Sequence, residues 1–519
     1  MDKNQLYFGD CLAILKELNA KHPGGFIDLT YIDPPFNSKR NYNVLFEEAN
    51  IKDAVAQKEA FADTWSNVSY KDTIEEIQDL DLDLFKFLQA LDSIRISKSA
   101  MAYLSTMAIR IYYIQKVLKD TGSFYLHCDP TMSHYLKLIC DLVFGEKNFQ
   151  NEICWRRATS GSSKAVAKRF GSDHDVIFFY SKSAQYSFNK IFLEYPEYEI
   201  KKRFKNRDER GHYKDAELAT YSQEKLALLK EENRLIVTKT GKLRYKIYLD
   251  DIKGVLADDV WIDIFPINSQ AKERLGYPTQ KPEVLLERII NASTKEGDLV
   301  ADFFCGCGTT IAAAQKLKRK WLGADISHLA IGLIERRLID SYGINIKKTF
   351  EVHGLPKDVA SAKRLAEDSH NGRLGFQDWI IETMLNGIFN PKKTADGGWD
   401  GYLTFQADKK ETVLIEVKSG NVNVKNMREF CDVIKNEKAS AGVFVCFQEQ
   451  VTNPMQIRAK EEGYYNKELF GTTYDKIQII TVEDLLHGLR PNFPKSTEGT
   501  FKKAQRKETG DGTKQEKLF

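Results

Sequence analysis

The tetrapeptide Asp33-Pro34-Pro35-Phe36 combines residue types that could hold a planar amine. Two successive prolines cannot continue a strand ladder, so we expect a rigid loop at the carboxyl end of the apolar strand 26–32. There Asp33 and the Pro34 carbonyl could accept both amine hydrogens while Phe36 stacks on the ring. Accepting both hydrogens directs the nitrogen lone pair out of the ring plane, toward an electrophile. The alternative interpretation is a rigid surface turn.

A second candidate site is the turn Gly306-x-Gly308-Thr309-Thr310, which follows a strand ending in Asp302 and precedes a helix. Glycines allow a ligand close to the backbone, and the start of a helix offers free N–H groups. Asp325 ends the next strand, where a carboxylate can accept hydrogen bonds from both ribose hydroxyls. There is no GK[ST] sequence, so a P-loop is not expected. The pattern therefore predicts a site for a nucleoside cofactor.

A third candidate site lies near the carboxyl end of the chain. Asp400 follows the glycines of Asp396-Gly397-Gly398-Trp399, and Glu416 and Lys418 share one face of a later strand because strand side chains alternate. Two carboxylates can hold Mg²⁺, with a lysine beside them to orient or deprotonate an attacking water. The helix before them offers Asp378 and Glu382 as further carboxylates.

The elements that must position these residues alternate between strand and helix. Apolar strands are expected at 26–32, 123–127, 176–180, 299–302 and 321–324, with helices between them. This alternation predicts an α/β fold, a doubly wound Rossmann-like sheet, with a smaller α/β domain after it.

Between 155 and 274 the alternation weakens, and basic, aromatic and glycine residues interleave. Such runs are either a solvated surface or a surface that faces nucleic acid, and their place inside an α/β domain favours DNA. The candidate DNA-binding residues are Arg156, Arg157, Lys164, Lys201, Lys202, Arg203, Lys205 and Arg207.

The chain resembles the amino-group DNA methyltransferases that use S-adenosylmethionine. Residues 33–36 look like their catalytic motif and 302–310 like their cofactor motif, and 277–282 (YPTQKP) is similar to the segment that lines the methionine end of the cofactor. The order of these motifs is that of the circularly permuted beta subclass. The resemblance covers about residues 4–350. It implies cofactor contacts from Thr279, Lys281, Asp302, Phe303, Gly306, Gly308, Thr309, Thr310 and Asp325.

The resemblance also implies a mechanism: direct methyl transfer from sulfonium to the amine of a base flipped out of double-stranded DNA, with adenine N6 favoured over cytosine N4. Tyr31 or Asn37 could assist. Phe303 stands where the family more often has proline, and Cys307 where serine is common. Many members of the subclass pair, which implies a homodimer.

Residues 370–489 resemble the PD-(D/E)xK nuclease fold, and Mrr-like restriction endonucleases in particular, through DGGWDG at 396–401 and the later ExK. This resemblance implies Mg²⁺-dependent DNA cleavage through Asp400, Glu416 and Lys418, with Asp400 and Glu416 as metal ligands. Three readings stay open: a bifunctional restriction–modification enzyme, a solitary methyltransferase whose last domain only grips DNA, and a DNA-binding protein without activity. An RNA or protein methyltransferase is a further alternative.

Composition supports several internal domains. The 519 residues include 42% hydrophobic and 29% charged residues, no apolar run long enough to span a bilayer, and a net charge of only +3, so nucleic-acid affinity must come from local patches. Eight cysteines without a CxxC pair argue against disulfides and zinc fingers. Cys305 and Cys307 could indicate redox chemistry, but small residues filling tight space are the expected explanation. We expect a cytoplasmic, nucleoid-associated bacterial protein that does not bind membranes.

The expected organisation has six segments. They are a catalytic part (1–154), a target-recognition insertion (155–274), a cofactor-binding part (275–350), a connector (351–370), a nuclease-like domain (371–489) and a disordered tail (490–519). The tail ends in Gln515-x-x-Leu518-Phe519, which is similar to the peptides that dock on the replication sliding clamp.

Overall fold

The computed structural model describes residues 3–35, 70–94, 96–158, 171–218, 222–238, 240–268, 270–277, 279–367, 372–390, 397–406, 410–466, 473–493 and 504. The chain divides into two compact units, which are described separately. One unit comprises Met1–Ser187 with Val260–Phe519, and the other comprises Phe188–Asp259.

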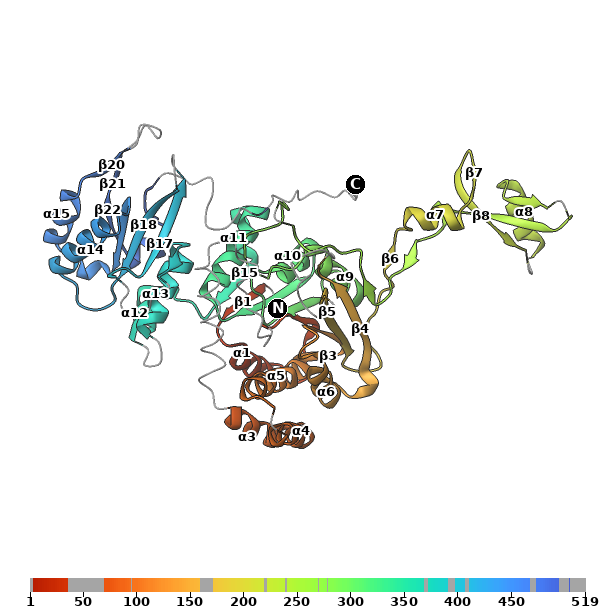
Figure 1. Cartoon of the computed structure of the whole chain (residues 1–519), viewed down its shortest axis with the longest axis horizontal. Helices are drawn as coiled ribbons and strands as arrows, with labels where there is room; N and C mark the ends of the chain where they lie inside the picture. Colours follow the sequence, from red (N-terminus) through yellow and green to blue (C-terminus); the bar gives the residue numbers. More distant parts are fainter. Residues whose placement is uncertain are drawn as a thin grey trace. The chain divides into compact units, whose positions relative to one another are not determined.

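A nine-stranded sheet forms the centre of the first unit, in the order β12-β4-β5-β3-β2-β13-β14-β1-β15 (Figure 1). Its strands are β1 Asn4–Phe8, β2 Ile27–Ile32, β3 Leu118–Cys128, β4 Phe149–Arg156, β5 His174–Ser181, β12 Val260–Trp261, β13 Leu299–Asp302, β14 Lys320–Asp325 and β15 Phe350–His353. Among these strands, β5 is antiparallel to both of its neighbours, β3 and β4, and the other neighbouring strands are parallel to one another.

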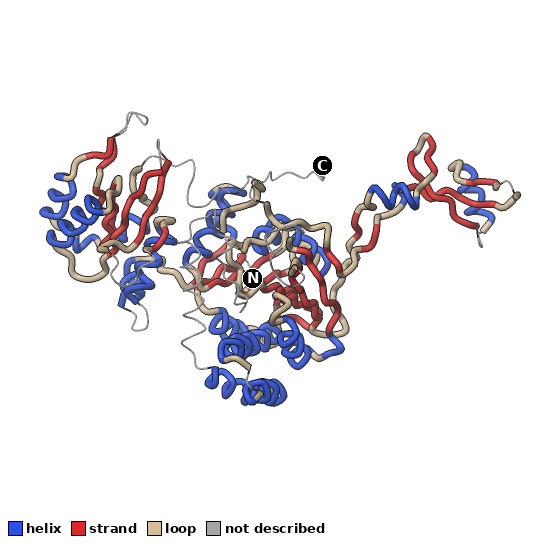
Figure 2. Tube along the Cα trace, in the orientation of Figure 1, coloured by secondary structure: helices blue, strands red, loops and turns tan. Residues whose placement is uncertain are grey.

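Helices cover both faces of this sheet, as the alternating blue and red segments of Figure 2 show. One face packs on α1 Cys11–Lys21, α3 Tyr70–Leu80, α4 Leu82–Ser93, α5 Lys98–Val117 and α6 Ser133–Phe144, and the other on α9 Glu283–Ser293, α10 Thr309–Lys316 and α11 His328–Tyr342. In β2, Leu29 and Tyr31 belong to the α9–α11 side and Ile32 to the α1 side. A strand buried on both faces must be apolar throughout, which explains its continuous apolar run. The expected doubly wound α/β fold is confirmed.

Two boundaries differ from the sequence-based expectation. β15 pairs with β1 from Phe350 to His353, so the sheet extends three residues into the expected connector. β5 falls within the expected insertion but pairs with β3 and β4 in the main sheet. The second compact unit therefore occupies only the middle of the insertion.

That second unit is built on a four-stranded sheet, β7-β8-β10-β9. Its elements are β6 Phe192–Leu193, α7 Glu197–Arg203, β7 Asn206–Asp208, β8 Gly211–Glu217, α8 Gln223–Glu231, β9 Leu235–Val237, β10 Leu243–Tyr248 and β11 Val255–Leu256. The Tyr248 ring packs under the Arg210 guanidinium, which also pairs with Asp251 at 2.6 Å.

The carboxyl-terminal part of the first unit contains a five-stranded sheet, β16-β17-β18-β19-β22, whose last three strands are parallel. The strands are β16 Ile388–Phe389, β17 Gly401–Gln406, β18 Lys410–Val417, β19 Ala441–Cys446 and β22 Ile477–Thr481. One face packs on α12 Val359–Glu367, α13 Gly372–Asp378, the π-helix η6 Trp379–Met384 and α16 Val482–Leu486, and the other on α14 Val424–Asn436 and α15 Asn453–Glu461. A short hairpin, β20 Tyr464–Asn466 with β21 Thr473–Asp475, completes the part.

Within the described ranges, no helix combines the length and the apolar character needed to cross a bilayer.

Candidate functional site

The two strands at the centre of the sheet bring the first two candidate sites together. β2 and β13 are adjacent and parallel, with Val300 opposite Leu29 and Ala301 opposite Thr30. Their carboxyl ends therefore reach the same edge of the sheet, where Asp33 follows one strand and Asp302 ends the other. In a doubly wound sheet, ligands bind at such an edge where neighbouring strands are distant in the sequence.

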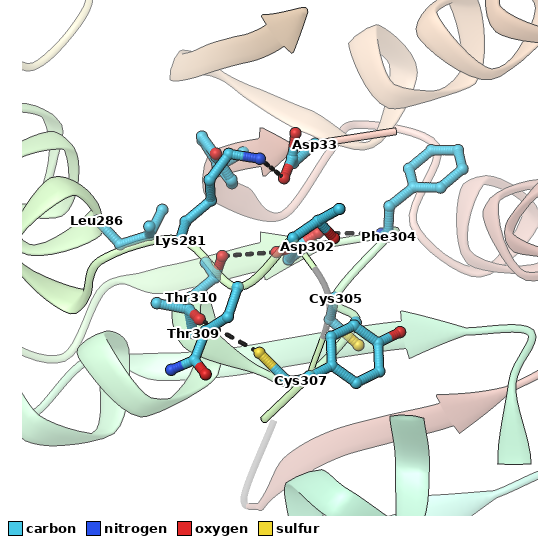
Figure 3. A pocket seen from close by; sticks show the side chains of 14 residues that line it. Asp33, Lys281, Leu286, Asp302, Phe304, Cys305, Cys307, Thr309 and Thr310 are labelled. Atoms are coloured by element: carbon cyan, nitrogen blue, oxygen red, sulfur yellow. Dashed lines mark hydrogen bonds and ion pairs between the residues drawn. The ribbon is translucent and has the colours of Figure 1, made fainter. Parts of the chain in front are cut away.

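A cavity lies at this edge (Figure 3). It encloses about 460 Å³, counting the space at its open mouth. It is lined by Tyr31, Asp33, Tyr277, Thr279, Gln280, Lys281, Leu286, Asp302, Phe304, Cys305, Gly306, Cys307, Thr309 and Thr310. Most of the predicted cofactor residues thus share one cavity with the predicted catalytic aspartate.

The glycine turn has the conformation that its sequence predicts. Gly306 and Gly308 have φ values of +48° and +74°, in the left-handed region that side chains disfavour. A Cβ on Gly306 would meet the Tyr277 ring at 3.4 Å, and one on Gly308 would meet Ile334 Cγ1 at 2.6 Å. α10 begins immediately afterwards at Thr309, so its first N–H groups lie beside the cavity.

Asp302 is a buried carboxylate on the cavity wall. Its Oδ2 accepts a hydrogen bond from the Thr310 hydroxyl at 2.5 Å, and its Oδ1 accepts one from the Phe304 N–H at 3.0 Å. Burial raises the pKa of Asp302 to about 7, although both hydrogen bonds favour its ionised form. A group that titrates near neutrality can change its charge when a ligand binds.

Asp325 is hydrogen-bonded to the backbone of the glycine turn but is not among the residues that line the cavity. Its Oδ2 accepts the Gly306 N–H at 2.8 Å and its Oδ1 accepts the Ser327 N–H at 2.9 Å. Burial raises its pKa to about 6. The contact of Asp325 with a ribose stays a prediction, but its hold on Gly306 is direct.

Asp33 is joined to the segment that the resemblance assigned to the cofactor. Lys281 Nζ contacts Asp33 Oδ2, and both side chains are mostly buried. Thr279, in the same loop, has a φ of +64°, a strained value for a β-branched residue that is found mainly at functional sites. Gln280 holds this loop closed through hydrogen bonds to Leu275 and Glu273.

The rest of the proline loop is only partly described. Pro34 is buried and Pro35 half-buried, both beyond the end of the β2 ladder at Ile32. Phe36 and Asn37 lie outside the described residues.

Phe303 does not lie where the sequence-based prediction placed it. Its side chain is 1% exposed and packs in the core on the α1 side, whereas its neighbour Phe304 lines the cavity. Successive side chains after a strand point in opposite directions, so one of the two had to face inward.

Cys305 and Cys307 are free, buried thiols, and burial raises the pKa of both. Reactive cysteines have lowered pKa values, so the packing explanation fits these two residues better than redox chemistry.

The predicted DNA-binding residues fall in both units. Arg156 is exposed at the end of β4. Lys201, Lys202, Arg203, Lys205 and Arg207 are exposed in and after α7 of the second unit, and Lys164 lies outside the described residues. Lys201 and Arg203 pair with Glu197 and Glu199 on their own helix. Such surface pairs are weak and leave the cations available to phosphates.

Arg157 differs from these exposed cations. Its Nε lies 2.6 Å from Oδ1 of Asp175, whose side chain is only 4% exposed. Arg157 therefore neutralises a buried carboxylate, which is a structural role that the basic sequence pattern does not reveal.

The third candidate site is also assembled. The Asp400 Oδ2 accepts the Val417 N–H at 2.7 Å, and Lys418 Nζ lies 2.5 Å from Glu416 Oε1. Oε2 of Glu416 is buried and has no hydrogen-bond partner in the described part of the chain. Burial raises the pKa of Glu416 to about 7; the Lys418 charge opposes this shift and Asp400 adds to it.

The helix residue beside this pair is Gln377, whose Nε2 donates to Asp400 Oδ1 at 3.0 Å. Glu382, predicted as a possible extra carboxylate, instead accepts the Leu329 N–H at the start of α11, at 2.9 Å. No group of three metal-ligating side chains occurs within the ranges that the structure describes.

The comparison with protein families decides the assignment of the larger fold. Residues 27–336, more than half of the chain, match the N6/N4 DNA methylase family. The chain belongs to this family. The match contains both strands that form the cavity, together with Asp33, Lys281 and the glycine turn.

Individual relatives agree with the N6/N4 methylase assignment. The Type II methyltransferase M.EcaI of Enterobacter cloacae is 33% identical over 261 residues, which are 46% of this chain and 57% of the relative. The StyLTI Mod subunit, a Type III restriction-modification enzyme of Salmonella typhimurium, is 24% identical over 73% of this chain and 60% of its own length. The chain thus spans less than two thirds of these relatives. A solved structure, the M1.HpyAVI–SAM complex, aligns with 64% of this chain and 98% of its own at 14% identity and a TM-score of 0.32.

The carboxyl-terminal sheet matches a different protein family from the methylase sheet. Residues 376–487 match the family described as NACHT-associated inactive Restriction Endonuclease 1. The part is therefore similar to restriction endonucleases, as expected, but to a family described as inactive and not clearly to the Mrr-like one. The expectation of Mg²⁺-dependent cleavage gains no support from this match.

Proposed function

We propose that this chain is a DNA methyltransferase that uses S-adenosylmethionine to methylate the exocyclic amine of a base flipped out of double-stranded DNA. The observation that carries the proposal is the cavity at the carboxyl ends of β2 and β13, which is lined by both Asp33 and the glycine turn. The named activities of the relatives support it. The motif Asp33-Pro34-Pro35-Phe36 favours adenine N6 as the target.

The cavity residues fit the proposed cofactor. Gly306 lines the cavity with a φ of +48°, a backbone conformation that side chains disfavour, so a ligand can approach its bare backbone closely. Thr309 and Thr310 present the amino end of α10, and Asp302 provides a carboxylate on the wall. S-adenosylmethionine, when bound, supplies the methyl group as an electrophile on its sulfonium.

The chain's own groups would act by holding the amine. Lys281 occupies Oδ2 of Asp33, so Oδ1 is the oxygen placed to accept an amine hydrogen, and the Pro34 carbonyl would accept the other. The nitrogen then forms the N–C bond as the C–S bond breaks, and afterwards loses a proton. Catalysis of this kind is mainly orientation and electrostatic alignment.

Asp33→Asn tests this function. The variant should lose methyl transfer to unmethylated DNA while still binding S-adenosylmethionine, because only one carboxylate oxygen changes. Methylated adenine is measured by sequencing of modified bases, and cofactor binding by calorimetry. Asp298→Asn is the control, since Asp298 lies outside the cavity and its Oδ2 accepts the Lys295 N–H. Full activity in Asp33→Asn would refute the assigned role.

A second candidate function is DNA cleavage by the carboxyl-terminal part, within a restriction–modification role. The specific observation in its favour is the buried Glu416 Oε2 without a hydrogen-bond partner beside Lys418 and Asp400, since a divalent cation would satisfy it. The alternative is that this part only grips DNA, as the match to an inactive family favours.

Incubation with DNA, with and without Mg²⁺, separates these readings. If cleavage occurs, the wild type gives Mg²⁺-dependent fragments and Glu416→Gln gives none, while both methylate equally. Intact DNA under all conditions would leave gripping as the function of this part.

A further inference from the structure

A row of buried polar side chains crosses the sheet next to the cavity. Tyr31 Oη on β2 lies 2.8 Å from His127 Nδ1 on β3, and His127 Nε2 lies 3.3 Å from Asp175 Oδ2 on β5. Tyr31, His127 and Asp175 are at most 3% exposed. Of these three residues, only Tyr31 lines the cavity, which it shares with Asp33. Polar groups so deeply buried must be hydrogen-bonded, and their directions are therefore fixed.

The charge at the far end of the row determines the direction of the hydrogen bond between His127 and Asp175. Burial disfavours ionised Asp175, but the hydrogen bond from His127 and the nearby cations Lys281 and Arg157 hold its pKa below the usual range. An ionised carboxylate only accepts, so His127 donates from Nε2. In the tautomer that has its proton on Nε2, the other nitrogen, Nδ1, carries a lone pair that can accept the Tyr31 hydrogen.

This arrangement leaves Tyr31 with an unusual property for a hydroxyl in a pocket. When Nδ1 of His127 accepts its only hydrogen, the Tyr31 oxygen has nothing but lone pairs to offer another group. Burial and the nearby carboxylates of Asp33, Asp302 and Asp175 raise the pKa of Tyr31 well above its usual range, so the hydroxyl stays neutral.

We propose that Nδ1 of His127 accepts the Tyr31 hydrogen, that Tyr31 is thereby a catalytic acceptor in the amine pocket, and that His127 and Asp175 are positioning residues that aim its lone pairs. The target nitrogen becomes positively charged as the N–C bond forms and the C–S bond breaks. An oxygen lone pair beside it stabilises that charge in the transition state more than it stabilises the neutral amine. The inference rests on the proposed methyl transfer to an amine.

The adjacent strand offers a matched control. Tyr125 lies directly opposite Tyr31 in the β2–β3 register, is equally buried, and donates or accepts a hydrogen bond with Ser293 at 2.8 Å. It does not line the cavity. Tyr125→Phe therefore removes the same atom at the same depth without changing the pocket.

The test compares steady-state and single-turnover methylation of DNA by the full-length wild type, Tyr31→Phe and Tyr125→Phe. Tyr31→Phe should lower kcat by about 10- to 100-fold, the effect of one lost hydrogen bond to a charged group, with both KM values within about twofold. Tyr125→Phe should keep the wild-type kcat. An unchanged kcat in Tyr31→Phe, or an equal loss in both variants, would overturn the proposal.

Two variants of His127 test the positioning role. His127→Gln keeps an oxygen that can accept the Tyr31 hydrogen, whereas His127→Leu does not. The glutamine variant should retain the larger part of kcat, and equal losses would contradict the role of the row in aiming Tyr31. If the wild type transfers no methyl group to DNA, the proposed function itself fails and this inference fails with it.

Discussion

Replacing Gly308 by alanine tests whether the glycine turn is shaped for a cofactor. Gly308 has a φ of +74°, and a Cβ there would lie 2.6 Å from Ile334 Cγ1. Ile334 lies on the buried face of α11 and is 1% exposed, so its side chain cannot rotate away into solvent. The turn itself must move by most of an ångström to reach an ordinary contact distance.

Two costs follow from this geometry. The left-handed backbone costs an alanine about 1–2 kcal/mol, and overpacking a buried site costs about 1–3 kcal/mol more. When about 1.4–2.8 kcal/mol of this cost falls on the cofactor-bound turn, the Kd rises by about 10- to 100-fold. We therefore expect Gly308→Ala to weaken cofactor binding by about 10- to 100-fold in addition to destabilising the fold.

Gly297→Ala is the matched control. Gly297 has a φ of +85° but nothing within 4 Å of an added Cβ, so the variant has the backbone cost alone. Calorimetric titration with S-adenosylmethionine should give a wild-type Kd for Gly297→Ala and a raised Kd for Gly308→Ala. Because the chain has several domains, thermal scans serve only to show that each variant is folded.

A second substitution makes the reasoning refutable. Ile334→Ala removes the atom in conflict, so Gly308→Ala combined with Ile334→Ala should regain part of the cofactor affinity lost in Gly308→Ala. Strictly additive losses would show that the contact with Ile334 does not matter. An unchanged Kd in Gly308→Ala would refute the cofactor role of the turn.

Three further predictions concern charged groups. Burial raises the pKa of Asp302 to about 7 and of Asp325 to about 6, so the positively charged cofactor should bind more tightly as pH rises through 6–7. The stability conferred by their neutral forms is lost as pH rises from the ordinary carboxyl pKa of 3.8 to these raised values. Titration calorimetry and unfolding at pH 5.5 and 8 measure both trends, and a Kd independent of pH would contradict the first. Lys281→Met should lower the melting temperature of the cofactor-free protein, because it leaves the mostly buried Asp33 without its cation at a cost of about 2 kcal/mol. Lys281→Arg keeps the cation and should not lower it. Equal melting temperatures of the two variants would show that the ion pair contributes nothing to stability. Burial and the nearby Asp378 raise the pKa of Glu382 well above its usual range, so Glu382→Gln, which still accepts the Leu329 N–H, should melt within about 1 °C of the wild type. Glu382→Leu cannot accept this hydrogen bond and should be destabilised by about 1–3 kcal/mol. Similar melting of the two variants would refute the role of Glu382 as the acceptor of the Leu329 N–H.

Sequence patterns predicted the parts of the site that follow strand ends. Asp33 and Asp302 each come after an apolar strand of a doubly wound sheet, and such ends converge at one edge. Local conformational rules likewise predicted the glycine turn. These inferences need only residue type and the direction of a strand.

Contacts between distant segments could not be predicted in this way. Tyr31 meets His127 across 96 residues, and His127 meets Asp175 across 48, through pairings that no local pattern specifies. The role of Arg157 was missed for the same reason, because a basic run does not show which cation faces a buried carboxylate. Glu382 was one of two candidates for a further carboxylate, and its contact with Leu329 could not be predicted because the packing of η6 on α11 depends on the tertiary fold.

The strand order of the methylase sheet determines when the site can form during synthesis. One edge of β2 pairs with β3, which begins 86 residues after β2 ends, whereas its other edge pairs with β13, which begins 267 residues after β2 ends. On the ribosome, the central strand of the sheet therefore keeps one edge open through hundreds of peptide bonds. An open apolar edge is prone to pair with other chains, and a long-range partner arrives slowly. The unit Phe188–Asp259 emerges during this interval and has its own sheet, so its folding need not wait for β13. A ribosome that stalls after β3 but before Leu299 would release a chain in which the strand before Asp33 has one unpaired edge and no glycine turn beside it.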